Sequence, residues 1–130
     1  MANDAVIIEL IEGGVPVRFT IADGDPYNKG RLMEIKNPRL AYGTWNNNDE
    51  FIGITCSEKV ANDGSTSIAL WTKGIFDLGA NAAVVAGERV TIGGNNLIRK
   101  VTAGDLLHSN VGITLESSSG AETVAVFVGK

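Results

Sequence analysis

Residues suited to catalysis are scarce in this chain of 130 residues. Its one histidine, His108, and its one cysteine, Cys56, are far apart in the sequence. A nucleophilic site of the Ser-His-Asp or Cys-His type would have to include His108. A catalytic metal ion normally takes a cluster of histidine, cysteine or carboxylate ligands, which these two residues do not supply. The inventory favours a protein that is not an enzyme, with no metal or other cofactor expected.

Two short motifs are similar to ligand-binding loops but lack the residues that would complete them. Asp23 and Asp25 have a spacing seen in calcium loops, but Pro26 follows and no acidic residue closes the loop. The glycine-rich run at residues 93–96 lacks the Lys-Ser/Thr pair of a phosphate loop. We predict that both are turns and that residues 93–96 close a hairpin.

The cluster most typical of a binding site combines aromatic rings with amides. Tyr42 and Trp45 are followed by three consecutive asparagines, Asn46, Asn47 and Asn48. Exposed aromatic rings beside amides suit stacking on a sugar or a hot spot in a protein interface. The alternative is an ordinary long polar loop. Tyr42, Trp45, Asn46 and Asn47 are therefore candidates for a surface-binding loop.

The charge pattern argues against nucleic acid and membrane partners. The chain has 11 basic and 15 acidic residues, a net charge of −4, and no run of Lys or Arg that would form a basic stripe. The apolar run at residues 6–8 ends at Glu9 with no positive region before it, unlike a signal peptide. No apolar stretch approaches the ~18 residues of a membrane span. We expect synthesis in a cytoplasm and no intrachain disulfide.

Short runs of alternating apolar residues, separated by turn residues, predict a mainly β protein. Many of the 16 glycines cluster with Asn, Asp or Ser, which tolerate the positive φ of tight turns. The predicted strands span residues 15–21, 31–36, 39–42, 51–55, 67–72, 89–92, 97–101, 111–115 and 123–128. One or two short helical turns are expected, at residues 80–86 and 102–108. This spacing favours a small barrel or sandwich.

The first residues allow two interpretations. Residues 5–11 are apolar apart from Glu9 and mostly β-branched, and they lead into Gly13-Gly14. They form either the first core strand or an arm that adds to the sheet edge of another chain. The chain is therefore divided into residues 1–14, an N-terminal arm or first strand, and residues 15–130, a single β-rich domain.

One pattern occurs twice, as Ile-Gly-Ile-Thr at residues 52–55 and as Val-Gly-Ile-Thr at residues 111–114. After a polar loop, each is followed by an apolar strand with an aromatic residue at the same point, Trp71 or Phe127. The pattern predicts a repeated hairpin, although two ordinary hairpins can also resemble each other by chance. Glycine inside a strand is costly unless something approaches it closely. We expect each aromatic ring to cover its glycine across the sheet.

Several motifs, taken in order, resemble one known family. They are Gly24-Asp25-Pro26 before a strand, residues 52–55, a polar loop into residues 67–71, Lys73-Gly74-Ile75-Phe76 as a K-G-x-F ending, residues 86–90 and residues 111–114. The family comprises the small decoration proteins, also called head-stabilising or cement proteins, of tailed bacteriophages. The resemblance covers residues 15–130, and the loop at residues 37–48 departs from the family pattern.

The resemblance implies a β-tulip-like fold and a structural role without chemistry. Such proteins bind the outer surface of the expanded capsid as homotrimers, bridge neighbouring major capsid protein subunits and stabilise the virion head. The N-terminal segment commonly reaches the capsid, which makes Ala5, Val6, Ile7 and Ile8 the candidate capsid contacts. The aromatic loop keeps an alternative open, a stand-alone β-sandwich module that binds carbohydrate or a host surface.

Overall fold

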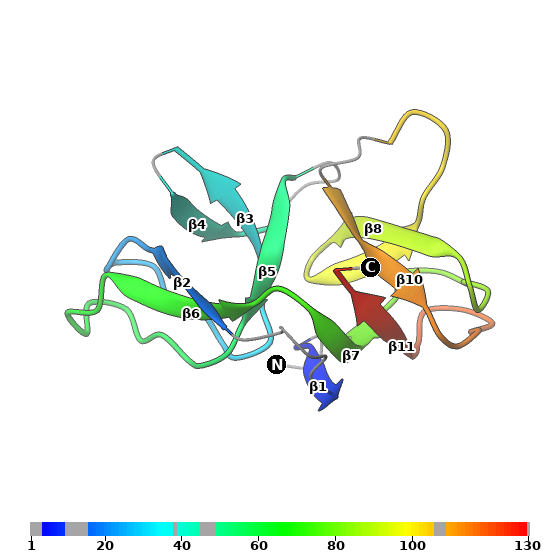
Figure 1. Ribbon diagram of the computed structural model, residues 1–130, viewed down its shortest axis with the longest axis horizontal. Helices are drawn as coiled ribbons and strands as arrows, with labels where there is room; N and C mark the ends of the chain where they lie inside the picture. The colour runs from blue at the N-terminus through cyan, green and yellow to red at the C-terminus, as the bar shows by residue number, and fades with distance from the viewer. Residues whose placement is uncertain (1–3, 10–15, 38, 45–48, 106–108, 130) are drawn as a thin grey trace.

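The computed structural model describes residues 4–9, 16–37, 39–44, 49–105 and 109–129. Within these residues the chain forms β-strands joined by turns and loops (Figure 1). The strands are β1 (Val6–Glu9), β2 (Val17–Thr20), β3 (Leu32–Lys36), β4 (Leu40–Gly43), β5 (Phe51–Thr55), β6 (Ser67–Trp71), β7 (Gly74–Gly79), β8 (Arg89–Gly94), β9 (Leu97–Lys100), β10 (Asn110–Thr114) and β11 (Thr123–Val128).

The strands build two sheets that lie side by side, as Figure 1 shows. The first is a closed five-stranded barrel in the order β2-β4-β3-β5-β6. The second is a six-stranded sheet in the order β1-β7-β11-β10-β8-β9. This second sheet also curls, because Ala80, directly after β7, forms a parallel bridge with Ile98 of β9. The prediction of a mainly β protein with a small barrel or sandwich is confirmed.

The two sheets repeat one strand arrangement, with β2 to β6 corresponding to β7 to β11. In the barrel, Met33 of β3 pairs with Gly53 of β5. In the second sheet, Val90 of β8 pairs with Gly112 of β10. One residue further along β3 and β8, the register shifts in both pairs. The hairpin β3–β4 matches the hairpin β8–β9 over three pairs, from Met33–Gly43 and Val90–Lys100 onward, before a register shift in β8–β9 that β3–β4 lacks.

The interiors of the two sheets match position by position. The interior of the barrel holds Phe19, Ile21, Tyr27, Met33, Ala41, Ile52, Ile68 and Leu70. The paired strands and loop bridges align these, in the same order, with Leu78, Ala80, Val84, Val90, Ile98, Val111, Val124 and Val126. Because apolar residues recur at every aligned position, the repeat extends from the two predicted hairpins to two whole five-stranded units.

The two units pack on each other through a continuous core. Leu32 and Ile54 of the barrel belong to the same buried cluster as the interior of the second sheet. Asn96, at the tip of the β8–β9 hairpin, adds a polar connection. Its buried side chain accepts a hydrogen bond of 2.7 Å from the Leu32 N–H and donates one of 3.2 Å to the Gly30 carbonyl.

The expected covering of each repeated glycine by an aromatic ring is wrong. The register pairs Trp71 with Ile54 and Phe127 with Ile113, one position away from each glycine. A Cβ atom at Gly53 would lie 2.7 Å from the Trp71 carbonyl oxygen, and one at Gly112 would collide with the Phe127 carbonyl oxygen. The glycines are therefore required by the close approach of the neighbouring strand's backbone.

Other local predictions had mixed outcomes. Residues 93–96 close the β8–β9 hairpin, with positive φ at Asn95 and Asn96 as in a type I′ turn, so that prediction is confirmed. The helical turn expected at residues 80–86 is wrong, because Ala80 and Val84 form β-bridges there. Residues 102–105 form a hydrogen-bonded turn, in which the Asp105 N–H donates to the Thr102 carbonyl. The rest of the helical turn expected at residues 102–108 lies outside the described part. The strand β7 was not predicted as a separate element.

Candidate functional site: the N-terminal strand and a tyrosine cleft

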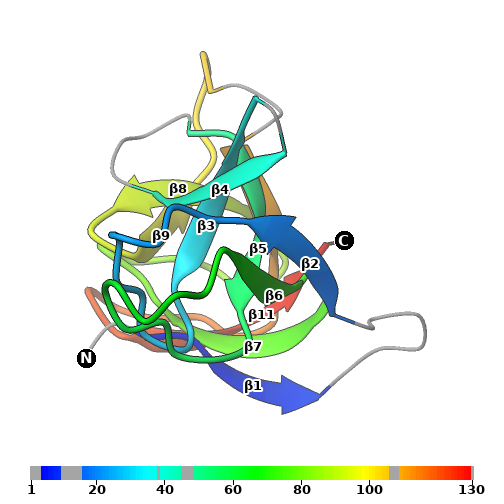
Figure 2. The same cartoon turned by 90° about the vertical axis from the view of Figure 1, so that its left-hand side faces the viewer.

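The N-terminal segment forms a strand of the second sheet in its described part. Val6 and Ile7 of β1 pair antiparallel with Asp77 and Phe76 of β7. The N–H of Ala5 donates a hydrogen bond of 2.8 Å to the Gly30 carbonyl of the barrel. In its described part the segment is therefore a strand of this chain's own sheet that touches both units. Figure 2 shows β1 at the outer edge of the sheet, beside β7.

The candidate capsid contacts divide into two faces. Ala5 is 7% exposed, and Ile7 packs against the core. Val6 and Ile8 are 59% and 53% exposed. This alternation follows from the period of a strand, in which successive side chains point to opposite faces. Only Val6 and Ile8 are thus available for contact with another molecule while β1 keeps its place.

A cavity of about 260 Å³ adjoins this strand and is lined by Asp4, Ala5, Val6, Ile7 and Lys29. The ammonium of Lys29 lies 5.7 Å from the centre of the Trp71 ring, in a cation–π contact. The hollow lies beside Val6, so the strand and its surroundings form one candidate surface.

The second candidate surface contains one residue of the predicted aromatic loop. Tyr42 lies at the end of β4 and is half-buried. Trp45, Asn46 and Asn47 lie outside the described residues. Tyr42 lines a cavity of about 310 Å³, which it shares with Asp25, Pro26, Tyr27, Arg31 and Gly43. A second cavity of about 210 Å³ is lined by Asp4, Asn28 and the same Pro26, Tyr27 and Arg31. We call the two together the tyrosine cleft.

The guanidinium of Arg31 lies directly against the backbone of β4. Its Nη2 donates a hydrogen bond of 2.7 Å to the Thr44 carbonyl. A Cβ atom at Gly43 would lie 2.8 Å from the Arg31 Nε, so glycine makes room for this side chain. Burial lowers the pKa of Arg31, an effect that Tyr27 and Asp4 oppose.

Tyr27 forms the wall that both cavities share. Its ring packs against the interior of the barrel, while its backbone pairs with Lys59. Burial, and then the charge of Asp25, raise the pKa of Tyr27, and a hydrogen bond from the Gly43 backbone opposes the change. The phenol therefore stays protonated and can donate a hydrogen bond. Sequence reasoning missed Tyr27 and Arg31, because no local motif connects them with Tyr42.

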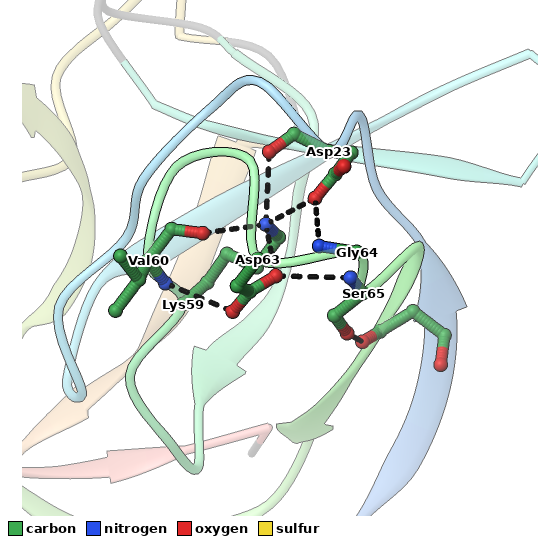
Figure 3. A network of polar contacts seen from close by, with 7 residues as sticks. Asp23, Lys59, Val60, Asp63, Gly64 and Ser65 are labelled. Atoms are coloured by element: carbon green, nitrogen blue, oxygen red, sulfur yellow. Dashed lines mark hydrogen bonds and ion pairs between the residues drawn. The ribbon is translucent and has the colours of Figure 1, made fainter.

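The aspartates that suggested a calcium loop have another role, shown in Figure 3. Lys59 is buried, and its Nζ lies 2.9 Å from Asp23 Oδ1 and 2.7 Å from Asp63 Oδ1. The same ammonium also donates to the carbonyls of Asp23 and Val60. The ammonium of Lys59 thus occupies the oxygen cage and joins two loops of the barrel. Residues 23–24 form a turn, as predicted.

The residues considered for catalysis show no arrangement for it in the described part of the chain. Cys56 is half-buried, and burial raises the pKa of its thiol, which disfavours the reactive thiolate. His108 lies outside the described residues. Among the residues that are described, no three His, Cys, Asp or Glu side chains group closely enough to hold a metal ion. The described residues also include no helix long and apolar enough to cross a membrane.

Comparisons with known protein families and with curated protein sequences find no match for this chain.

Proposed function

We propose that this chain is a non-enzymatic capsid decoration protein of a tailed bacteriophage. It binds the outer surface of the mature virion as a homotrimer and bridges subunits of the major capsid protein. The proposal starts from the sequence resemblance. The structural observation that supports it best is β1, an edge strand in the described sheet with Val6 and Ile8 turned outward.

An edge strand is suited to joining two proteins. Its outer backbone groups can pair with a strand of another chain, which is the usual mode of β-strand addition. Val6 and Ile8 add apolar area that would be covered in such a complex. Since β1 is anchored to β7 and to Gly30, a load on the bound strand passes to both units of the molecule.

The stabilising mechanism is mass action. A ligand that binds only the expanded lattice stabilises it by RT ln(1 + [L]/Kd) for each site. A trimer engages several subunits at once, so its avidity exceeds the affinity of one contact. No chemical step is needed for this role.

The direct test is co-sedimentation with expanded, DNA-free capsids of the virus that encodes the chain. The wild type should sediment with them, and the double variant Val6→Ser/Ile8→Ser should lose most of its binding. Val60→Ser/Val85→Ser is the matched control, because these valines are 59% and 61% exposed and belong neither to β1 nor to the cavity beside it. Absence of wild-type binding would refute the proposal, and equal loss in both variants would refute the role of β1.

The oligomeric state gives a second test. Light scattering of the purified chain at micromolar concentration should give the mass of a trimer, three times 13.7 kDa. A monomer under the same conditions would contradict the homotrimer.

A further inference from the structure

The internal repeat allows the tyrosine cleft to be compared with the same place in the second sheet. Tyr27 aligns with Val84, because each forms the loop bridge of its unit. Arg31 aligns with Glu88, because the carbonyl of each accepts the N–H of the repeated threonine, Thr55 or Thr114. Tyr42 aligns with Arg99 through the register of the two matching hairpins. Comparing the two units therefore indicates which residues this strand arrangement requires and which it does not.

None of the residues that build the cleft recurs in the second unit. The guanidinium of Arg99, at the position of Tyr42, makes bonds of 2.9 and 2.6 Å to Asp105 and takes part in a local ion pair. The loop before Tyr27 is also longer. Residues 22–26 separate Ile21 from Tyr27, whereas only residues 81–83 lie between the equivalent Ala80 and Val84. This longer loop includes Asp25 and Pro26, which line the cleft.

The same strand arrangement thus forms without the cleft residues. Tyr27 shares in the interior of the barrel, as Val84 does in the second sheet, but a valine is sufficient there. Tyr42, Arg31 and the longer loop are not needed to build a unit of this fold. Because these residues line one cavity and are not required by the strand arrangement, we infer that the cavity binds a ligand.

The chemistry of the walls indicates the ligand class. Tyr27, Tyr42 and Pro26 supply flat apolar surfaces, while Asn28, Arg31 and the tyrosine hydroxyls supply hydrogen-bond donors. Asp4 and Asp25 supply acceptors, and together they outweigh the charge of Arg31. An anionic ligand would meet a net negative wall. A ligand with apolar faces, many hydroxyl groups and no charge fits these groups on every side.

We propose that the tyrosine cleft binds a neutral saccharide, with one ring against the tyrosines and its hydroxyl groups bonded by Asp25, Asn28 and Arg31. The larger cavity, about 310 Å³, lies at the lower end of the range for small-ligand sites, which suits a single sugar ring. The adjoining cavity of about 210 Å³ takes a substituent or part of a second ring. This site shares Asp4 with the cavity beside β1, but neither Val6 nor Ile8, the proposed capsid contacts, lines it.

The test is a titration followed by amide chemical shifts, with glucose, galactose, mannose, N-acetylglucosamine and lactose as probes. Galacturonic acid and N-acetylglutamate serve as anionic probes. We expect at least one neutral sugar to bind at millimolar concentration or below, with shifts centred on residues 25–31 and 42–44. Tyr42→Arg, which installs the residue of the second unit, should weaken this binding by about tenfold or more.

A second pair of variants separates binding from folding. Asn28→Ala should weaken sugar binding, whereas Val85→Ala, the aligned and 61% exposed position, should leave it unchanged. A thermal melt of each variant confirms that the fold is retained. The proposal is overturned if no neutral sugar on the panel shifts the cleft amides, if only the anionic probes bind, or if Tyr42→Arg and Asn28→Ala both bind the sugar as well as the wild type.

Discussion

The repeated glycines provide the sharpest test of the fold. In Gly112→Ala, the new methyl group would collide with the Phe127 carbonyl oxygen and lie 3.0 Å from the Val128 Cα. In Gly53→Ala, it would lie 2.7 Å from the Trp71 carbonyl oxygen and 3.0 Å from the Leu70 Cβ. Most of these neighbours are backbone atoms inside paired strands, which move only if the pairing is distorted.

The magnitude follows from the cost of inserting a methyl group into packed structure, about 1–3 kcal/mol. We expect Gly112→Ala to lie at or above the upper end of this range and Gly53→Ala within it, because the contact at Gly112 is closer. Gly120→Ala is the control, since a Cβ there meets nothing within 4 Å and its φ is not in the left-handed region. That variant should be neutral or gain up to about 1 kcal/mol through the unfolded state.

The assay is urea unfolding followed by tryptophan fluorescence, with a thermal melt alongside. For a chain of this size, 1 kcal/mol corresponds to a Tm change of about 3–5 °C. The expected order of stability is Gly120→Ala, then Gly53→Ala, then Gly112→Ala. If Gly112→Ala is as stable as Gly120→Ala, the carbonyl contact does not explain the repeated glycine and the reasoning is refuted.

Three further outcomes are expected from the same unfolding measurements. Asn96→Gly should lower the free energy of unfolding by about 1–3 kcal/mol, because it leaves the buried N–H of Leu32 without its acceptor. Asn95→Gly is the control and should lower it less, because Asn95 is exposed in the same turn and also has a positive φ. Burial of the carboxyl, and next the negative charge of Asp49, raise the pKa of Glu34. The stability that depends on the neutral form of Glu34 is therefore present at low pH and lost as the pH rises through the pKa of the folded state. Glu34→Gln should raise Tm at pH 7 and change it little below pH 4.5, the ordinary pKa of the carboxyl group. The hydrogen bond from Lys59, and next the one from the Ser65 N–H, lower the pKa of Asp63. Asp63→Asn should therefore reduce Tm above pH 3.8, and its Tm should converge with that of the wild type as the pH falls through the pKa of the folded state. For either variant, a Tm curve parallel to that of the wild type across the pH range would contradict the prediction.

Several elements were predictable because their signals are local. β5 and β11 have the expected bounds, and the Asn95-Asn96 turn follows from the tolerance of asparagine for positive φ. β7 was missed because only Thr72 and Lys73 separate it from β6, with no turn motif to mark the boundary. Its alternating burial became clear only once its partners were known.

The candidate site was less predictable than the fold. Tyr42 could be predicted as a site residue because aromatic residues near consecutive asparagines are typical of a binding surface. Tyr27 and Arg31 reach the same cavity only because the β3–β4 hairpin brings them to Tyr42. The two faces of β1 likewise depend on pairing with β7, which no pattern in residues 5–8 specifies.

The matching registers of the two units also bear on the origin and the future use of this chain. Such a pair is the arrangement that results when a short gene is copied and its two products are joined end to end. Once joined, one copy can hold the scaffold while the other changes its loops. The barrel has a longer loop and two tyrosines where the second unit has Val84 and the Arg99–Asp105 ion pair, which is the kind of difference that such divergence would produce. For protein engineering, the matching registers define the positions at which loops of the first unit would be grafted onto the second.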